Sequence, residues 1–393
     1  MDERKPSSVP RWIFIATLIV VLFYTPLAIN YTWPLFFPDA PRLQDKLNTL
    51  INGSTYAVGS GSVESVRHVD YSQHRVVLLI HTSLGALALL LAMFQFSARL
   101  RLGHPAVHRW IGRGYLTLMT ASMLTALLFL LTAPAAQHFI GRAFETQLRG
   151  LAISTLGSAW YAVYAIRRGD MVSHRAWMTY SIAFMMTAPL LRVLWIGMQP
   201  VIPHHDLLTN IGVAALILGV IAPGGAAIIF ILTRHDGPAP GVRAASMWTY
   251  ATIVLLTAIG SGTYIAMTVR LPDPIPHSLA AYHVVPVAIY LLVGFIGVRN
   301  ARARGNTVRE QQWRWLLWGF AAAPMATTLY SLIVPPSFTA ADAVIAGGMD
   351  GAVIPITIAF ARVVHAAATA NTGAVTTATT ASAESTAARE PAA

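Results

Sequence analysis

The sequence of 393 residues contains no cysteine. That absence excludes a disulfide framework, a thiolate metal site and a cysteine nucleophile. Charged side chains are also scarce, at 11% of the residues, whereas soluble globular proteins carry roughly a quarter. So little charge leaves too few polar groups to cover a water-soluble body. The sequence also has no phosphate loop, dinucleotide fingerprint, zinc-protease helix or nucleophile elbow that would assign a reaction.

Apolar residues, by contrast, make up 55% of the chain and fall in long blocks. The blocks run to about 18 to 25 residues, the length of helix that crosses a hydrocarbon layer of about 30 Å. A transmembrane barrel would instead show dyad alternation in segments of about ten residues. The sequence therefore predicts an all-α integral membrane protein, a bundle of about ten transmembrane helices. We expect them near residues 12–32, 76–98, 110–132, 149–166, 176–198, 207–233, 246–269, 279–299, 314–334 and 343–365.

The net charge of +11 is carried mainly by arginines in the short loops between the apolar blocks. If the N-terminus is cytoplasmic, 19 of the 27 Lys and Arg residues lie on the cytoplasmic side, seven lie outside, and Arg192 falls within a span. The positive-inside rule therefore predicts that both termini are cytoplasmic. We expect the lipid bilayer as partner, no nucleic acid, and a location in the cell membrane, as a multi-pass protein of the bacterial inner membrane.

The chain divides into five expected parts. Residues 1–33 form an N-terminal tail and an uncleaved first span, and residues 34–74 form an outer loop that is either a small cap or irregular. Residues 75–198 hold spans two to five, and residues 199–365 hold spans six to ten. The tail at 366–393 is rich in Ala and Thr and lacks an apolar face, so it is expected to be disordered.

A weak internal repeat links the two halves at an offset of six spans. The run from His108 to Tyr115 resembles the run from Trp313 to Phe320, and His81 opens the second span much as His283 opens the eighth. The loops after spans one and seven also begin alike, at 37–41 and 271–274. An even offset would place the repeat axis along the membrane normal. Chance similarity among apolar helices explains the resemblance equally well.

Ionisable side chains inside spans are costly and indicate functional sites. His81, His283, Arg192 and Asp350 all fall in the outer part of their spans. The structural interpretation is an intramembrane polar pair, Arg192 with Asp350, plus two interfacial histidines that hold the helices in register. The functional interpretation is a binding or redox site lined by the histidines. The sequence favours the structural interpretation.

A second group lies at the predicted cytoplasmic side, where two motifs each begin a helix. One is His108-Arg109-Trp110 and the other is His174-Arg175-Ala176-Trp177. Arg and Trp at this depth are typical of membrane anchoring, which is the favoured interpretation. The alternative uses the imidazoles as ligands of haem b or a metal, with arginines meeting the propionates. The candidate cofactor-binding residues are His81, His108, His174, Arg109 and Arg175, and the candidate metal ligands are His81, His108, His174 and His283.

Several of these residues together resemble a known family. His81 with Gly85 and Gln95, the run from His108 to Tyr115, the run from His174 to Met178, and Arg192 are similar to a family of bacterial predicted membrane proteins, catalogued only as a domain of unknown function. The resemblance covers about residues 74–197. It implies a multispan membrane domain but no activity. Its characteristic polar positions match His81, Gln95, His108, Arg109, Gly112, Arg113, Tyr115, His174, Arg175, Trp177 and Arg192.

The sequence leaves three functional hypotheses. The leading one is a membrane redox or cofactor-binding protein that uses His108, His174 and His81, with haem b as the candidate cofactor. The second is a proton-coupled small-molecule transporter, because spans six and ten are broken by Gly and Pro and the run 347–351 places glycines around Asp350. The third is a membrane enzyme that acts on a lipid, with Asp350 or a histidine as general acid.

Overall fold

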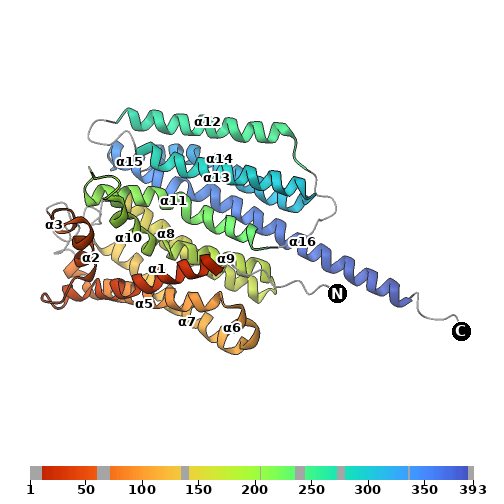
Figure 1. Cartoon of the computed structure of the whole chain (residues 1–393), viewed down its shortest axis with the longest axis horizontal. Coiled ribbons are helices and arrows are strands. Elements are labelled where there is room, and N and C mark those ends of the chain that lie inside the picture. Colours follow the sequence, from red (N-terminus) through yellow and green to blue (C-terminus); the bar gives the residue numbers. More distant parts are fainter. Residues whose placement is uncertain are drawn as a thin grey trace.

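The computed structural model describes residues 11–59, 71–133, 141–203, 205–234, 244–271, 279–334 and 337–387. These residues form α-helices, short helical turns and loops, with no strand among them (Figure 1). Within this part of the chain, nine helical stretches are long and apolar enough to cross a membrane. They are α1 (Arg11–Asn30), α5 (Arg75–Gln95), α7 (Pro105–Thr132), α9 (Met171–Met185) with α10 (Thr187–Met198), α11 (Leu207–Leu232), α12 (Met247–Val269), α13 (Leu279–Ala303), α14 (Thr307–Ile333) and α15 (Ala340–Ala346) with α16 (Val353–Ala387).

A further helix, α8 (Arg142–Arg167), runs through the bundle beside α9 and α7. Its 26 residues give a length of about 39 Å, enough to cross a bilayer. Charged residues near its ends, Arg142, Glu145, Arg149 and Arg167, lower its hydropathy relative to the other helices. With α8 included, the described part of the chain makes ten passes. The start of α1 and the end of α16 then lie at the same end of the bundle, as Figure 1 shows.

The two ends of the bundle differ, and we name them by what they carry. The cap end holds the outer-loop helices α2 (Leu43–Asn52) and α3 (Ser54–Val58), and the opposite α6 end holds α6 (Ala98–Gly103). Of the two possibilities open for the outer loop, its described residues form a small helical cap. The cap is bonded to the bundle: Asn52 donates to the backbone oxygen of Ile196, and Tyr56 donates to that of Trp195.

Two predicted spans are not continuous helices. The fifth span breaks between α9 and α10, three residues before Pro189, whose ring cannot fit against the carbonyl one turn earlier. The tenth span contains a π-helical turn, Gly347–Gly351, between α15 and α16. The five residues of that turn include three glycines, and each lies against a neighbouring helix so closely that a Cβ atom would collide with it.

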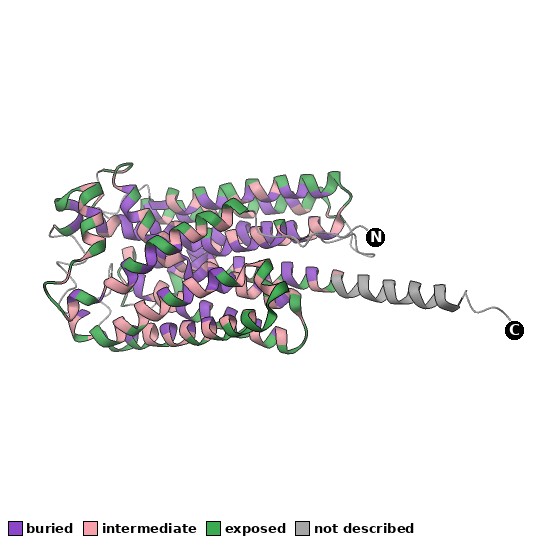
Figure 2. Ribbon diagram, turned by 60° about the horizontal axis from the view of Figure 1, so that its bottom comes forward, coloured by how far each residue is buried: buried purple, intermediate pink, exposed green. Residues whose placement is uncertain are grey.

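The core lies around α11, whose side chains are buried along most of its length (Figure 2). Small residues let its neighbours approach. A Cβ atom at Gly219 would lie 2.4 Å from the backbone oxygen of Met349 in the π-helical turn. Apolar side chains on the outer helices point outward instead; Trp248 on α12 is 82% exposed in the absence of lipid. This distribution is the one expected of a bundle embedded in a bilayer.

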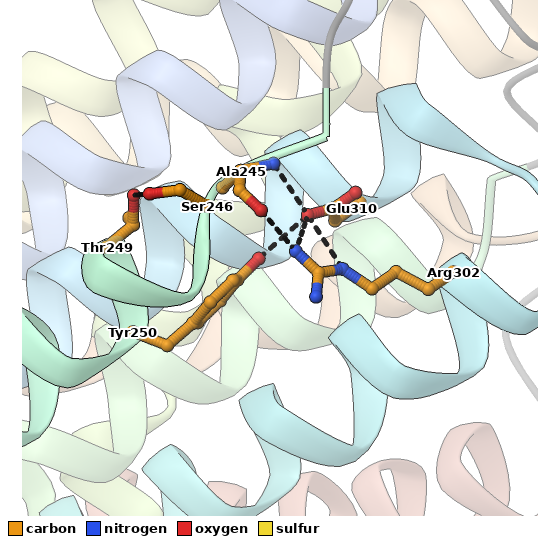
Figure 3. Close-up of polar contacts among 6 residues, drawn as sticks. All are labelled: Ala245, Ser246, Thr249, Tyr250, Arg302 and Glu310. Carbon is orange, nitrogen blue, oxygen red and sulfur yellow. Dashed lines mark hydrogen bonds and ion pairs between the residues drawn. The ribbon is translucent and has the colours of Figure 1, made fainter.

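A buried ion pair ties three helices together at the α6 end (Figure 3). Arg302, near the end of α13, donates from Nε and Nη2 to Oε1 of Glu310 at the start of α14, over 3.1 and 2.9 Å. The same carboxylate oxygen accepts from the Tyr250 hydroxyl, in the first turn of α12, and from the backbone N–H of Ala245, just before α12. Arg302 also donates to the Ala245 carbonyl. No motif in the sequence marks Glu310.

The disorder of the C-terminal tail stays a prediction. Helix α16 continues to Ala387, although the sequence predicts disorder from residue 366. Alanine has the highest helix propensity of any residue, and the Ala-rich tail follows a long apolar helix that has already nucleated. The last six residues lie outside the described part of the chain.

Corresponding hydrogen bonds occur in the two halves proposed as repeats. In the first half, Nδ1 of His81 on α5 lies 3.1 Å from Oγ of Ser122 on α7. In the second half, Nε2 of His283 on α13 lies 3.1 Å from Oγ1 of Thr327 on α14. The sequence offset that aligns residue 108 with residue 313 also aligns residue 122 with residue 327. The two histidines, however, are 202 residues apart rather than 205, so the repeat stays a prediction; part of the loop at 271–274 also lies outside the described residues.

Candidate functional site

Asp350 lies within the π-helical turn of the tenth pass. A π-helical turn adds a residue to the helix and changes the direction of the side chains that follow, and such turns are frequent at functional sites. The Tyr330 hydroxyl on α14 donates to Oδ2 of Asp350 over 3.3 Å. Thr146 on α8 lies beside the same carboxyl group. On its other side, Gly150 of α8 leaves room, since a Cβ atom there would be 3.6 Å from Oδ1.

Arg192 projects from α10, the second half of the broken fifth pass. Its guanidinium carbon lies 5.4 Å from the ring centroid of Tyr24 on α1 and 5.1 Å from that of Trp195. These are cation–π distances, and they fix the plane of the charged group between two aromatic rings. Nη1 donates to the backbone oxygen of Ala188 one turn earlier, over 3.1 Å. Nε is buried and has no hydrogen-bond partner in the described part of the chain.

His81 is held by Ser122 across the α5–α7 contact. Its Nδ1 lies 2.9 Å from the Ser122 backbone oxygen, and the Ser122 hydroxyl donates to the His81 backbone oxygen over 2.8 Å. A carbonyl oxygen only accepts hydrogen bonds, so Nδ1 carries the proton and Nε2 of the neutral ring is an acceptor. Gly85 makes this close approach possible, because a Cβ atom there would be 2.9 Å from the Ser122 hydroxyl oxygen.

One cavity of about 340 Å³ brings these three groups together. His81, Arg192 and Asp350 all line it, as do Tyr330 and Ser122. Most of the remaining lining is apolar and comes from α1, α5, α7, α8, α9, α10, α11, α14 and α16. A mostly apolar cavity of this size with a few convergent polar groups is the usual form of a small-molecule site. Three of the four polar residues expected in the outer layer therefore line one space.

Arg192 and Asp350 were predicted as an intramembrane polar pair. The structure places both on the same cavity, but within the described residues no ion pair joins them. Each has its own neighbours instead: aromatic rings for the guanidinium, and hydroxyl groups for the carboxyl. Because the two charges are not paired with each other, the Arg192 guanidinium has no ionic partner among the described residues.

His283 is not part of this cavity. It is fully buried between Tyr264 on α12, whose ring centroid is 5.1 Å away, and Thr327 on α14. Its ring also lies beside the backbone of Gly348 in the π-helical turn. The sequence grouped His283 with His81 because both lie at similar depths on their helices. Packing separates them, and His283 supports the turn that carries Asp350.

The second pair of histidines lies at the α6 end. His108 on α7 and His174 on α9 are within electrostatic range of each other, with Arg101, Arg109 and Arg175 nearby. Nδ1 of His174 bonds to the backbone oxygen of Ala162 on α8 over 3.0 Å. Nδ1 of His108 is buried without a partner in the described residues. Neither histidine lines the cavity.

The four histidines named as metal ligands do not gather at one point. His81 lines the cavity, His283 lies behind the π-helical turn, and His108 and His174 lie at the α6 end. In the described ranges, no group of three or more His, Cys, Asp or Glu side chains is placed to hold a metal ion.

Sequence reasoning missed several residues of the cavity. Tyr330 and Thr146 contact Asp350 from other helices, and Tyr24 and Trp195 flank Arg192. An aromatic or hydroxyl side chain near the end of a span is ordinarily an interfacial residue. The expectation of Gly- and Pro-broken spans was right for span ten and wrong for span six, which is the continuous helix α11, and the break before Pro189 in span five was missed.

The fold and the cavity define an all-α, multispan membrane protein with a polar site inside the bundle. Residues 78–223, from α5 into α11, match a family described as Predicted membrane protein (DUF2306). This confirms the resemblance expected over about residues 74–197, and the match extends further into α11. His81 and Arg192 lie within the matched stretch, whereas Tyr330 and Asp350 lie beyond it. No curated protein and no solved structure matches the chain.

Proposed function

We propose that the protein is a proton-coupled transporter of a small molecule, with the cavity as its binding site and Asp350 as its proton carrier. The observation that carries this proposal is the position of Asp350: an intramembrane carboxyl group on a glycine-rich π-helical turn, facing the same cavity as Arg192 and His81. Ionisable groups at such positions mark ion and proton pathways in membrane proteins.

The construction of the two passes that carry the charges supports transport. Arg192 follows the break between α9 and α10, and Asp350 lies in the break between α15 and α16. Discontinuous helices around a central site are a recurring feature of secondary transporters. They let one half of a pass move without unfolding the other half. The corresponding hydrogen bonds in the two halves of the chain agree with the repeat architecture common in such proteins.

Proteoliposomes that contain the pH-sensitive dye pyranine test the proposal. Carboxylates, amines, alcohols and sugars are added one class at a time under an imposed pH gradient, and proton entry is followed by dye fluorescence. We expect at least one class to drive proton entry with the wild-type protein, and Asp350→Asn to abolish it. Asp342→Asn is the matched control, because Asp342 lies about two turns upstream, in the first turn of α15, where it accepts a hydrogen bond from the Thr339 hydroxyl and does not line the cavity.

The proposal is wrong if no class drives proton entry, or if Asp350→Asn transports protons as fast as the wild-type protein. Size-exclusion profiles of the variants in detergent separate loss of transport from loss of folding. The asparagine has nearly the same volume as the aspartate and keeps an acceptor for the Tyr330 hydroxyl, so folding is expected to survive.

Haem binding by His108 and His174 is the second candidate, supported by their proximity on neighbouring helices. Two histidines can ligate haem iron, and the arginines beside them could meet the propionates. An oxidised-minus-reduced absorption spectrum of protein expressed with ample haem tests it. Soret and α bands that disappear in His108→Ala and His174→Ala would support haem, and their absence from the wild-type protein would contradict it.

A further inference from the structure

The Arg192 guanidinium is a charged group in the bundle interior without an ionic partner. Among the described residues no carboxylate lies within ion-pair distance of it. Leaving one charge unpaired in a low-dielectric interior is costly, and such groups normally meet a counter-ion, a metal or water. The cation–π contacts with Tyr24 and Trp195 offset part of that cost. They do not supply the missing negative charge.

The pattern of used and unused donors on Arg192 is specific. Nη1 is occupied by the Ala188 backbone oxygen, and the guanidinium plane is fixed by the two aromatic rings. Nε is buried and unpartnered, and no described residue accepts from Nη2. Nε and Nη2 form one edge of the guanidinium fork, the edge that binds both oxygens of a carboxylate in a planar, bidentate arrangement.

The Asp350 carboxyl group, unlike Nε of Arg192, has a hydrogen-bond partner in the protein. Its Oδ2 accepts a hydrogen bond from the Tyr330 hydroxyl, so the carboxyl group has a partner without a cationic ligand. Thr146 lies beside it, but the Thr146 hydroxyl donates to the backbone oxygen of Ala143. His81 uses its Nδ1 proton on Ser122 and presents no second proton when neutral. The Thr82 hydroxyl, which also lines the cavity without a partner among the described residues, is neutral. The vacant charged donors of the cavity therefore belong to Arg192, and they require an acceptor that carries negative charge.

We infer that the cavity takes an organic anion, a monocarboxylate with an apolar body, whose carboxylate binds the Nε–Nη2 edge of Arg192. The apolar body would lie along the aliphatic and aromatic side chains that form most of the lining, such as Leu89, Met123 and Phe184. This inference rests on the proposed function and names its substrate class. The anion on Arg192 and the proton on Asp350 occupy different parts of the cavity, so the pair would move together without net charge.

Three probes of equal length and different head group test the inference: 4-phenylbutyrate, 4-phenylbutan-1-ol and 4-phenylbutylammonium. Binding to the full-length protein in lipid nanodiscs is measured by calorimetry, with empty nanodiscs subtracted. We expect the carboxylate to bind about tenfold or more tightly than the alcohol, because charge-assisted bidentate bonds are roughly twice as strong as neutral ones. The ammonium probe should bind most weakly.

Substitutions of Arg192 then locate the preference. Arg192→Gln should bring the carboxylate and alcohol affinities to within about threefold of each other while the alcohol still binds, which also shows that the cavity has folded. Arg192→Lys should keep only part of the preference, because an ammonium lacks the planar fork. Arg142→Gln is the matched control, since Arg142 lies at the cap end, bonded to Ser337, and does not line the cavity.

The inference is overturned if the ammonium or the alcohol binds as tightly as the carboxylate, or if Arg192→Gln leaves the carboxylate preference intact. It is also overturned if none of the three probes binds to the folded protein. None of these results decides the proposed function. That is judged by Asp350-dependent proton entry with compounds of all four classes, so the two proposals can fail separately.

Discussion

Nη2 of Arg302 lies 2.9 Å from Oε1 of Glu310, and the carboxylate side chain of this pair is only 2% exposed. That single oxygen accepts four hydrogen bonds, two from Arg302 and one each from Tyr250 and the Ala245 N–H. The pair joins the end of α13 to the start of α14 and fastens both to the start of α12. Because α14 also packs against the π-helical turn, the Arg302–Glu310 ion pair supports the helix that bears Tyr330.

Glu310→Gln should weaken this junction. The amide keeps the shape of the side chain but removes its charge, so Arg302 loses its anionic partner. The new NH2 group of the glutamine is a donor and lies among groups that are themselves donors. We expect a loss of about 1 to 3 kcal/mol, toward the lower end of the range for buried pairs because Arg302 is partly exposed. Thermal unfolding in detergent measures it. Arg299→Gln, at an exposed position on α13, should leave the midpoint of thermal unfolding unchanged. An equal drop of the midpoint in both variants would contradict a specific role for the Arg302–Glu310 ion pair.

The cap depends on Tyr56, and its attachment should depend on pH. Burial raises the pKa of the Tyr56 phenol above its ordinary value, because desolvation disfavours the phenolate, while the hydrogen bond from Asn210 acts in the opposite direction. The stabilisation from the neutral phenol is therefore complete below about pH 10, the unfolded value, and is lost as the pH rises through the folded value.

A spin label at Leu50→Cys, an exposed position on α2, reports whether the cap is docked. We expect its mobility to rise when the pH increases from 9 toward about 11.5. In the Tyr56→Phe background the label should be more mobile at pH 8 already, because two hydrogen bonds are lost, each worth about 1 kcal/mol. The rise at high pH should be absent there. The same rise in both backgrounds would show that another group controls the cap.

The sequence predicted the number of passes and their places well, because each pass must bury about 20 apolar residues whatever its neighbours are. Spans near 110–132, 207–233 and 246–269 correspond to α7, α11 and α12 within a few residues. The polar residues His81, Arg192 and Asp350 were also found from sequence, since an ionisable group in an apolar block is conspicuous. The depth argument placed them in one layer with His283; the three line one cavity in the structure, whereas His283 does not line it.

What the sequence could not supply is the pairing of side chains between distant helices. The bond from Tyr330 to Asp350 depends on the extra residue of the π-helical turn, and the ion pair of Arg302 with Glu310 crosses a helical hairpin. Neither has a spacing that marks it. Arg192 and Asp350 were predicted as partners because they are opposite charges at similar depth. Aromatic rings and hydroxyl groups from other helices occupy the positions that such a pair would need.

The close packing of the π-helical turn against α11 gives a further prediction. A Cβ atom at Gly219 would lie 2.4 Å from the Met349 backbone oxygen, so Gly219→Ala must push the turn away. We expect a loss of about 1 to 3 kcal/mol, the usual cost of overpacking, together with slower Asp350-dependent proton entry. Gly157→Ala on α8 is the control: it is exposed with nothing within 4 Å of the added atom. There the helix should be unchanged or stabilised by up to about 1 kcal/mol. Equal behaviour of the two variants would rule out the close approach at Gly219.

Because the chain has no native cysteine, its orientation can be tested by single substitutions. Asp39→Cys places a thiol on the exposed cap end, and His104→Cys places one in the exposed connection between α6 and α7. If both termini are cytoplasmic, as the arginine distribution predicts, a membrane-impermeant maleimide should label Asp39→Cys in spheroplasts, in which the inner membrane is intact. It should label His104→Cys only after the membrane is permeabilised. The reverse labelling pattern would show that the protein has the opposite orientation in the membrane. The cap end, near which Tyr31 and Tyr71 line the cavity, would then face the cytoplasm, and the cavity would bind its anion on that side.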